Sequence, residues 1–386
     1  MTKKTLLVSE IFPPTTGGSG RWFFEVYSRL SKKDYYIAGG THPDAEQFDK
    51  QHPELSIDRW HLKIPSWGIL SFSGLYAYTT LFFKLAGMIR REKIEALHSA
   101  RNLPEGFLCW LASKLFRRPY LTYVHGEELQ TLAASRELFF MSRLVYNGAQ
   151  RIIVNSANTK RLMIDYYPST SDKIRIVHPG VNSEYFVPAK PSEKVRKELG
   201  WGNRTVMITV GRLQKRKGHD NTIRALHAIK KAIPDILYVI IGNGEENEHL
   251  RELVRELNLE EHVQFRGEIT DGQLLRCYQQ CDLFILANRD INGDIEGFGM
   301  VLVEAQACGK PVIAGDSGGT AETMIPGETG LLIDCTNPDL IAKGVVSILT
   351  DQEKHRAISK KARDWVENNL DWKSLVHKAA AIFDEL

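Results

Sequence analysis

Short runs of apolar residues alternate with helical stretches along nearly the whole chain, and this alternation constrains the fold more than any other feature. The runs are rich in β-branched and aromatic residues, which is typical of strands buried on both faces of a parallel sheet. The sequence therefore predicts an α/β protein in which helices connect parallel strands. The predicted strands are 5–9, 36–38, 96–98, 120–124, 152–155, 173–177, 206–210, 237–241, 263–266, 283–287 and 311–314. The predicted helices include 22–30, 106–115, 137–147, 193–199, 220–231, 246–257, 271–281, 339–350 and 353–368.

The chain is long enough for two domains. Its 386 residues exceed what one hydrophobic core usually organises. The turn at 178–182 and the polar stretch after it mark the end of a first series of strands, and a second series begins at residue 206. The predicted domains are 1–182 and 183–368, and a helix over 369–386 is expected to return to the first domain.

The stretch Glu296–Ala305 carries the strongest chemical signal in the second half. Two glycines, Gly297 and Gly299, precede a helix and allow close backbone approach to a ligand. The amides of Met300 and Val301 fall in the first helical turn, where they have no intrahelical acceptors and favour an anion. The carboxylates of Glu296 and Glu304 can each accept hydrogen bonds from neighbouring hydroxyls. Phosphate-binding amides flanked by two such carboxylates suit a sugar nucleotide, whereas a helix cap with two solvated glutamates is the simpler alternative.

A basic loop, 211–218, follows the predicted strand 206–210. It contains Arg212 and the run Lys215–Lys217, which would suit a diphosphate but could equally be a solvated loop. Because this loop and the Glu296 motif both follow strands of the second half, they are expected to open on the same edge of the sheet. Cations and carboxylates at one edge together favour a nucleotide-sugar site more strongly than either feature does alone.

A glycine-rich loop with Gly17 and Gly18 follows the first strand. It resembles a dinucleotide fingerprint only weakly, because the loop is long and no acidic residue ends the next strand. An alternative is that its amides meet a phosphate held mainly by the other domain. His125 follows the strand 120–124, at the edge where ligands of parallel sheets bind. Either a structural or a functional histidine would fit this position.

The charge is unevenly divided between the halves. Residues 1–182 contain 24 Lys and Arg against 16 Asp and Glu, a net charge of +8, whereas the whole chain carries +3. A basic half suggests an anionic partner such as a lipid phosphate, although a solvated basic face is an equal alternative. The uncharged segment 64–83 contains proline, glycine and hydroxyl residues that make it a poor membrane span. It is expected to be a loop and a packed helix, with an interfacial membrane anchor as the alternative.

The five cysteines are odd in number and show neither a disulfide framework nor a zinc spacing. No signal peptide is evident at the start of the sequence. The sequence therefore predicts a cytoplasmic protein, with the inner face of the membrane as a further location if segment 64–83 meets lipid.

In their order along the chain, these features resemble the retaining family 4 glycosyltransferases (glycosyl transferases group 1) of the GT-B fold. The resemblance covers nearly the whole chain and is strongest in the second half. It rests on Gly17-Gly18, His125-Gly126, 178–182, Val210–Leu213 with Lys217-Gly218, Gly242–Gly244, Phe265–Gly267, Glu296–Gly299 with Glu304-Ala305, and Gly318-Gly319. Glu296 and Glu304 form the Glu-x7-Glu pattern of that family. The long loop before Glu296, with Asn288 and Arg289, departs from the usual pattern.

The resemblance implies a GT-B architecture, in which two Rossmann-like domains face each other across a cleft, and it assigns roles to individual residues. The expected donor-diphosphate ligands are Gly17, Gly18, Arg212, Lys217, Met300 and Val301. The expected donor-sugar ligands are Glu296, Gly297, Phe298 and Gly299. The residues expected at the ribose and base are Gly211, Arg266, Gly267, Ile269 and Glu304. His125 and Glu296 are the expected catalytic residues, and neither a metal nor another cofactor is expected.

The predicted activity is transfer of a hexose from a nucleotide-diphosphate sugar, with retention, to a hydroxyl of a glycan or lipid-linked acceptor. The favoured donor is UDP-glucose, followed by GDP-mannose. No nucleic-acid partner is expected, and peripheral membrane association remains open. The alternatives are a sugar-nucleotide epimerase or hydrolase of similar architecture and a non-catalytic, membrane-associated binding module.

Overall fold

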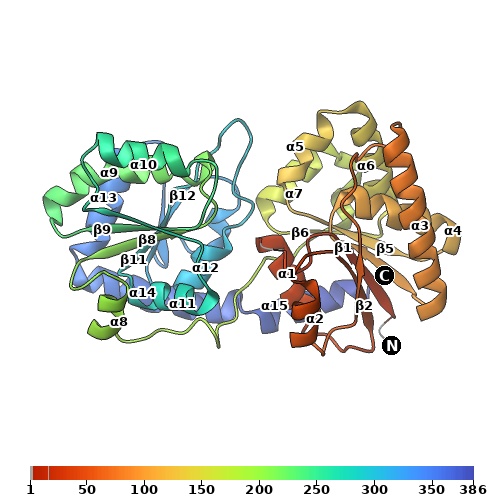
Figure 1. Ribbon diagram of the computed structural model, residues 1–386, viewed down its shortest axis with the longest axis horizontal. Helices are drawn as coiled ribbons and strands as arrows, with labels where there is room; N and C mark the ends of the chain where they lie inside the picture. The colour runs from red at the N-terminus through yellow and green to blue at the C-terminus, as the bar shows by residue number, and fades with distance from the viewer. Residues whose placement is uncertain (1–2, 16) are drawn as a thin grey trace. The chain divides into compact units, whose positions relative to one another are not determined.

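The computed structural model describes residues 3–15 and 17–386, so Thr16 of the predicted glycine-rich loop lies outside the described residues. The chain divides into two compact units (Figure 1). Unit 1 comprises the residues up to Pro179 together with Trp372–Leu386, and unit 2 comprises Gly180–Asp371. Each unit is built on one parallel sheet, seven-stranded in unit 1 and six-stranded in unit 2. The predicted α/β class with two Rossmann-like domains is confirmed.

The sheet of unit 1 has the order β3-β2-β1-β4-β5-β6-β7. Its strands are β1 (Thr5–Ser9), β2 (Tyr35–Gly40), β3 (Ile57–Trp60), β4 (Ala96–Ser99), β5 (Tyr120–Val124), β6 (Arg151–Val154) and β7 (Ile174–Ile176). Its helices are α1 (Gly18–Tyr27), α2 (Ala45–Gln51), α3 (Phe72–Glu92), α4 (Phe107–Phe116), α5 (Glu127–Ala133), α6 (Arg136–Gly148), α7 (Ala157–Tyr166) and α15 (Trp372–Phe383). Two short helical turns, Asn102–Gly106 and Pro168–Lys173, complete the unit.

Helices cover both faces of this sheet, as the continuous apolar strands require. Leu6 and Val8 of β1 belong to a core shared with Tyr78 and Leu85 of α3 and with helices α4 and α6. On the other side, α15 packs beside α1, where the Phe383 ring lies 5.9 Å from that of Tyr27. The end of the chain therefore contributes to the core of unit 1.

The sheet of unit 2 has the order β10-β9-β8-β11-β12-β13. Its strands are β8 (Val206–Val210), β9 (Leu237–Ile241), β10 (Val263–Gly267), β11 (Leu283–Leu286), β12 (Val312–Gly315) and β13 (Gly330–Ile333). Its helices are α8 (Glu193–Glu198), α9 (His219–Ala232), α10 (Asn247–Glu256), α11 (Asp271–Gln280), α12 (Met300–Ala307), α13 (Pro338–Leu349) and α14 (Gln352–Asn369), with short turns at Lys215–Lys217 and Thr320–Thr323.

Alternate residues of β8 divide the core of unit 2 between the two faces of its sheet. Val206 and Ile208 pack in the cluster that includes α11, α12 and α14 residues. Met207, between them, packs in the opposite cluster with α9, α10 and α13 residues. This two-sided burial explains why the strand reads as a continuous apolar run.

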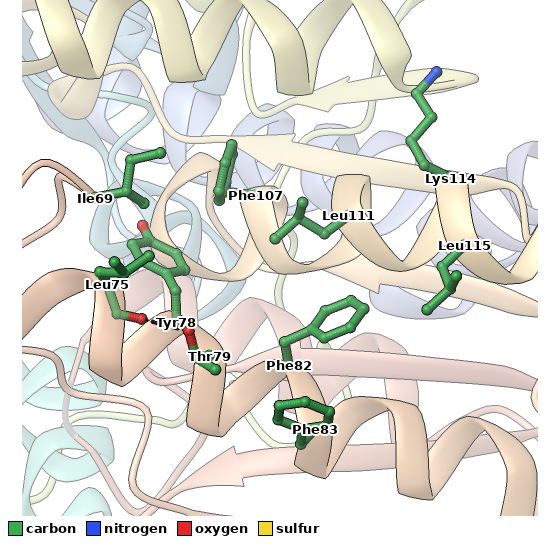
Figure 2. Close-up of a pocket in the computed structure, with 10 residues that line it drawn as sticks. All are labelled: Ile69, Leu75, Tyr78, Thr79, Phe82, Phe83, Phe107, Leu111, Lys114 and Leu115. Carbon is green, nitrogen blue, oxygen red and sulfur yellow. Dashed lines mark hydrogen bonds between the residues drawn. The ribbon is translucent and has the colours of Figure 1, made fainter.

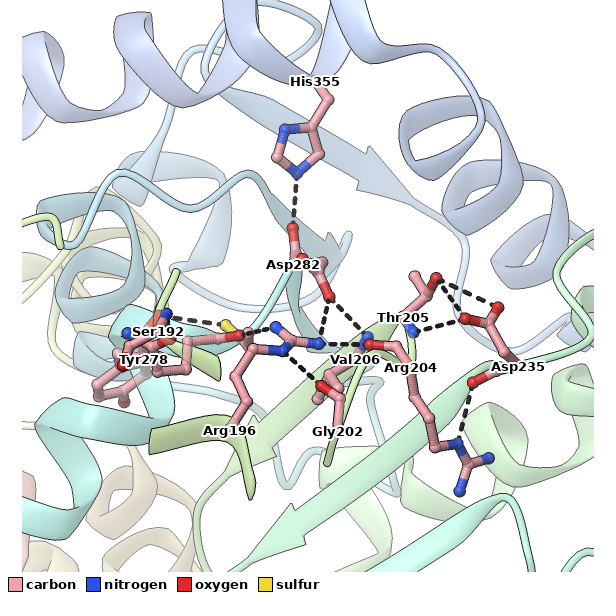
Figure 3. A network of polar contacts seen from close by, with 12 residues as sticks. Ser192, Arg196, Gly202, Arg204, Thr205, Val206, Asp235, Tyr278, Asp282 and His355 are labelled. Carbon is pink, nitrogen blue, oxygen red and sulfur yellow. Dashed lines mark hydrogen bonds and ion pairs between the residues drawn. The ribbon is translucent and has the colours of Figure 1, made fainter. Parts of the chain in front are cut away.

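Arg196 of α8 fastens the polar segment that begins unit 2 to the rest of that unit (Figure 3). Its Nε donates to the carbonyl of Gly202 at 2.9 Å, and its Nη2 lies 3.6 Å from the Asp282 carboxylate. Asp282 in turn accepts from the Val206 amide at 2.8 Å, and its carbonyl accepts from His355 Nε2 at 2.8 Å. The segment is therefore part of the folded unit.

Most predicted elements are present within two residues of their predicted ends, and three differences are informative. The predicted helix 22–30 begins at Gly18, because Gly18–Gly20 form its first turn instead of a loop. Strand β3 was not predicted, because its sequence IDRW is short and interrupted by charges. Strand β13 was not predicted either, because its four residues follow closely on a turn.

Candidate active site

The two motifs of the second half start from neighbouring strands. The basic loop follows β8 and the Glu296 motif follows β11, and these strands pair in parallel in the middle of the sheet. Here the strand order reverses: β9 and β10 extend to one side and β12 and β13 to the other. Ligands of open parallel sheets bind at such a reversal, beyond the carboxyl ends of the strands. The predicted shared edge is confirmed.

Lys217, Arg216 and Glu296 form one ion cluster at this edge. The ammonium group of Lys217 pairs directly with Glu296 Oε2, and Arg216 Nη1 donates to the same oxygen at 2.8 Å. The three side chains are only 11 to 13% exposed. Burial alone would raise the pKa of Glu296, but the charges of Lys217 and Arg216 hold the pKa below its ordinary value. Glu296 is therefore an ionised carboxylate in a nearly dry site.

Arg216 was not among the predicted site residues, whereas Arg212 was. In the structure Arg212 is exposed, and it is Arg216 that contacts Glu296 and, through Nε at 3.1 Å, Asp294. The basic run at 215–217 was the only signal in the sequence for Arg216. Which of three consecutive cations faces the acidic motif depends on the short helical turn they form.

Two glycines hold the backbone of this cluster in place. Gly318 has φ +71°, and a Cβ there would lie 2.0 Å from the carbonyl oxygen of Glu296, which also accepts from the amide of Gly319 at 2.9 Å. Gly218, also at φ +71°, would bring a Cβ within 1.8 Å of the carbonyl oxygen of Ala287. Only glycine permits both the left-handed backbone and the close approach. The loops after β8, β11 and β12 are thus locked together around Glu296.

The predicted helix after Gly299 is α12, and Gly299 caps it in a left-handed conformation with φ +96°. The amides of Met300 and Val301 therefore lie in its first turn, as the sequence predicts. Phe298 and Gly299 are buried, and Gly297 is half-buried. Backbone amides at a helix N-terminus, next to a Lys–Arg pair, can bind an anion such as a diphosphate.

Glu304 lies on α12 and is 3% exposed. Its Oε2 accepts a hydrogen bond from the hydroxyl of Tyr278 on α11 at 2.8 Å. The Tyr278 ring packs against that of Phe186 with 5.9 Å between centroids. Tyr278 therefore fixes the orientation of the carboxylate predicted to bind ribose. No sequence signal separated this tyrosine from the other core aromatics.

The other residues predicted at the base and ribose lie at the end of β8 or at the end of β10 and just beyond it. Gly267 ends β10, and its carbonyl accepts from the amide of Gly242 at 2.8 Å. The Gly211 amide donates to the carbonyl of Ile241 at 3.0 Å. Arg266 donates from Nη1 to the carbonyl of Leu199 at 2.9 Å, so this guanidinium also joins α8 to the sheet. Ile269 is half-buried beyond β10.

The long loop before Glu296 is anchored by a bidentate ion pair. Arg289, only 8% exposed, donates from both terminal nitrogens to the two oxygens of Asp220, each at 2.8 Å. Its amide also donates to the carbonyl of Arg216 at 2.8 Å. Arg289 is therefore buried, and it braces the loop against α9 and the basic turn.

Replacing Arg289 by alanine should destabilise unit 2. Removing one partner of a buried ion pair costs roughly 3–5 kcal/mol, and a loss of about 2–4 kcal/mol is expected because Asp220 keeps some exposure. Calorimetric unfolding of the full chain measures this loss. As a control, Lys361→Ala breaks the exposed pair with Glu328 and should cost less than about 1 kcal/mol. Equal losses in the two variants would contradict the structural role of Arg289.

The same pair has a predictable dependence on pH. Burial raises the pKa of Asp220, but its hydrogen bonds and proximity to Arg289 outweigh burial and lower the pKa. A carboxylate with a depressed folded-state pKa stabilises the fold above its unfolded pKa, and that stability is lost as pH falls. The difference in unfolding free energy between the parent chain and Asp220→Asn should therefore shrink below about pH 4. A difference that stays constant into this range would refute the assignment.

Unit 1 presents its own set of polar groups at the carboxyl edge of its sheet. His125, after β5, is 6% exposed, and its Nε2 donates to the carbonyl of Ala100, after β4, at 2.9 Å. The rings of Trp22 and Phe23 meet its imidazole edge-to-face at 5.7 Å. The Glu128 carboxylate accepts from the amides of His125 and Gly126, each at 2.9 Å. The histidine is thus held rigidly, with its Nε2 proton engaged.

The strand order of unit 1 reverses between β1 and β4, and an acidic and a basic side chain meet there. Arg101, after β4, pairs with Glu10, after β1, and its Nε lies 3.6 Å from buried Glu105. Gly17 caps α1 just beyond this position, and Gly18 is its first residue. The unit therefore has a polar edge and a helix N-terminus at its own reversal point.

Among the residues that the structure describes, no group of three or more His, Cys, Asp or Glu side chains is arranged to hold a metal ion. All five cysteines are buried as free thiols. None of the described helices has both the length and the apolar character needed to span a bilayer, and this includes α3, which contains part of the uncharged stretch 64–83.

Comparison with known proteins agrees with this geometry. The sequence model of the family "Glycosyltransferase Family 4" matches residues 16–185, and that of "Glycosyl transferases group 1" matches residues 191–365. A GDP-mannose-dependent alpha-(1-6)-phosphatidylinositol monomannoside mannosyltransferase of Mycolicibacterium smegmatis is 31% identical over 96% of this chain and 95% of its own length. The enzyme of Corynebacterium glutamicum that acts on the monoacylated form of that acceptor is 27% identical over 96% of this chain and 95% of its own.

The fold is also shared with solved structures. Anabaena Alr3699/HepE in complex with UDP superimposes with a TM-score of 0.83 at 21% identity, covering 99% of this chain and 100% of that one. Three findings lead to one conclusion: the two Rossmann-like units, the Lys–Glu cluster at the reversal of the second sheet, and the full-length similarity to mannosyltransferases. This chain belongs to family 4 of the GT-B glycosyltransferases and is a glycosyltransferase.

Proposed function

We propose that this enzyme transfers mannose from GDP-mannose, with retention of configuration, to a hydroxyl of a lipid-linked glycan acceptor. The Lys217–Glu296 pair at the reversal of the second sheet is the observation that carries the proposal. The names of the full-length relatives supply the donor and the class of acceptor. The sequence alone favoured UDP-glucose over GDP-mannose, and the relatives reverse that order. The UDP complexes of Alr3699/HepE share only the fold.

The ion cluster suggests how the donor is bound. In the structure Lys217 and Arg216 neutralise Glu296. A donor diphosphate would take over Lys217, assisted by Arg212 and by the amides of Met300 and Val301. Glu296 would then be free to accept hydrogen bonds from the sugar hydroxyls. One carboxylate thus exchanges its bond to an ammonium group for bonds to the substrate, and Lys217, Arg212 and Arg216 together would offset the charges of the diphosphate and of Glu296.

The chemical step would follow from the same groups. Departure of the diphosphate concentrates negative charge on its oxygens, where Lys217 and the α12 amides stabilise it. The sugar becomes cationic in character, and the ionised Glu296 stabilises that charge. The acceptor hydroxyl would attack the face from which the diphosphate departs and pass its proton to a departing phosphate oxygen. In this proposal Glu304, oriented by Tyr278, holds the ribose, and His125 of unit 1 is the second catalytic residue.

A factorial donor assay tests the proposal. GDP-mannose, GDP-glucose, UDP-mannose and UDP-glucose are compared with a phosphatidylinositol mannoside and with a water-soluble alkyl mannoside as acceptors. The four donors separate recognition of the base from recognition of the sugar. GDP-mannose should give the highest kcat/KM, and NMR of the product should show the α-anomer. A preference for either UDP-sugar, or a β-linked product, would overturn the proposal.

Activity should persist when divalent cations are removed, because cationic side chains and a helix N-terminus are proposed to carry the phosphate charge. Initial rates with GDP-mannose are measured in excess EDTA and after addition of Mg²⁺ or Mn²⁺. Rates should agree within about twofold, since no step is assigned to a Lewis acid. Loss of activity in EDTA that Mg²⁺ restores would contradict the proposal.

A further inference from the structure

Helices α3 and α4 of unit 1 expose an unusual concentration of large apolar side chains. Ten large apolar residues are exposed among those that the structure describes. Six of the ten lie on α3, just before it or on α4: Leu70, Phe72, Leu75, Tyr76, Phe83 and Leu115. Phe72 is 87% exposed and Phe83 is 70% exposed. A concentration of exposed apolar residues on neighbouring elements marks an interaction site, whereas single exposed apolar residues do not.

Three of these exposed residues, Leu75, Phe83 and Leu115, line an apolar cavity between α3 and α4. The cavity measures about 580 Å³ and is lined by Tyr78, Phe82 and Phe83 of α3 and by Leu111 and Leu115 of α4, among others. Figure 2 shows Leu111, Lys114 and Leu115 of α4 along one side and Phe82 and Phe83 of α3 along the other. Lys114 is the only charged residue of the lining. The volume suits an acyl chain or another apolar group of similar size.

Four basic side chains lie beside the patch, and one carboxylate, that of Glu137, accepts a hydrogen bond from the Leu70 amide at 2.7 Å. Lys84 and Arg90 on α3, Lys114 on α4 and Arg117 after it are exposed, and among the described residues none of the four has a carboxylate partner. Lys84 and Arg90 lie over the rings of Trp60 and Phe116, at 5.0 and 4.9 Å from their centroids. Aromatic packing therefore holds the two charged ends in place.

A second cavity continues the basic surface from Lys114. It measures about 440 Å³, and its lining includes Lys3, Lys114, Arg117 and Arg118. Lys114 thus lines both cavities, so an apolar groove and a cationic one meet at a single residue. An apolar groove that adjoins a cationic one matches an acyl chain followed by an anionic headgroup.

We propose that the α3–α4 face docks on the surface of an anionic lipid bilayer. Phe72, Leu75, Tyr76, Phe83 and Leu115 enter the acyl-chain boundary, and Lys84, Arg90, Lys114 and Arg117 contact lipid phosphates. Helix α3 then lies in the plane of the interface, as amphipathic helices with aromatic and basic residues do. The α3–α4 cavity receives an acyl chain. This docking requires neither the donor nor the transfer reaction, so it can be tested apart from the proposed function.

The charges favour a bilayer over a second copy of the chain. A symmetric contact through this face would place its unpaired cations near those of the partner, which opposes association. An anionic lipid surface offers the complementary charge and an apolar layer at once. Self-association through this face is the competing result that the experiment can detect.

Co-sedimentation of the full chain with vesicles tests the docking. Vesicles of phosphatidylcholine alone are compared with vesicles that also contain phosphatidylglycerol, at low and high salt. The triple variant Phe72→Ser/Phe83→Ser/Leu115→Ser removes the apolar part, and Ile325→Ser/Leu340→Ser is the matched control on exposed apolar residues of unit 2. The double variant Lys114→Gln/Arg117→Gln removes charge, and Lys231→Gln/Lys343→Gln is its control on exposed lysines of unit 2.

The parent chain and both controls should bind the anionic vesicles, and high salt should weaken this binding. The apolar variant and the charge variant should each bind the anionic vesicles at least about tenfold more weakly than the parent chain. This is expected because each basic residue and each buried aromatic ring contributes to the free energy of membrane binding. All variants should keep the parent's unfolding midpoint and its rate with the water-soluble alkyl mannoside.

Three results would overturn the proposal. They are equal binding to neutral and anionic vesicles, binding unaffected by both variants, and a dimer in sedimentation velocity that the apolar triple variant dissociates. None of them bears on the donor assay. Failure of the donor assay would likewise leave the vesicle result standing.

Discussion

Replacing Lys217 by alanine should weaken binding of GDP by about 10- to 100-fold. A charge-assisted hydrogen bond contributes roughly 1.5–3 kcal/mol, which converts to that range. The substitution also removes one of the two cations that pair with Glu296 and leaves only Arg216. The negative charge of Glu296 would then be less well neutralised and would repel the incoming diphosphate. Isothermal titration calorimetry of the full chain with GDP measures the effect directly.

Lys215→Ala is the matched control for this experiment. Lys215 lies in the same helical turn and is exposed, whereas Lys217 is buried. The control should bind GDP within about twofold of the parent chain, because exposed charges outside the contact contribute little. If both lysine variants lost the same affinity, the effect would reflect the general charge of the loop. If neither lost affinity, Lys217 would not bind the diphosphate.

Replacing Glu296 by glutamine should lower kcat by about 10- to 1000-fold, the usual range for loss of an electrostatic contact to a transition state. The carboxylate is ionised and nearly dry in the structure, so its charge acts strongly on a sugar that becomes cationic. Binding of free GDP should not weaken, because the substitution releases Lys217 from its ion pair. Steady-state kinetics with GDP-mannose and calorimetry with GDP separate the two quantities.

Glu304→Gln should behave differently, since ribose hydroxyls are bound alike in the ground and transition states. It should chiefly raise the KM for GDP-mannose. Glu353→Gln, an exposed glutamate at the start of α14, serves as the control for both substitutions and should leave kcat and KM unchanged. If Glu296→Gln abolished GDP binding and left kcat intact, the roles of the two glutamates would have to be exchanged.

Much of the site was predictable because its residues are close together in the sequence. Gly299, Met300 and Val301 form a turn and a helix start that depend on local backbone preferences, and the structure has them as predicted. The edge shared by the basic loop and the Glu296 motif also follows from local information. In a parallel sheet, all loops after strands open on one edge. The roles of these residues toward the donor stay predictions.

Contacts between distant segments were not predictable. Arg289 stands in a loop that departs from the family pattern, and it is buried against Asp220, 69 residues away. Arg216 lies next to a predicted ligand, and its contact with Glu296 spans 80 residues. Tyr278 of α11 donates a hydrogen bond to Glu304 of α12, 26 residues further along the chain. Over such separations, tertiary packing decides which side chains meet. Hydrophobic periodicity and secondary-structure propensity contain no information about that packing.

The sequence by itself determined the fold class, because continuous apolar runs separated by helices can be buried only in parallel sheets covered on both faces. It also determined the kind of chemistry, since glycines, cations and carboxylates appear at the ends of those runs. Only the tertiary structure decided that β8 and β11 are neighbours, which brings Lys217 to Glu296. Only the structure decided that α3 and α4 leave an apolar, cation-bordered face uncovered. The order of strands and the pairing of helices depend on how whole surfaces fit together, and no stretch of sequence contains both surfaces.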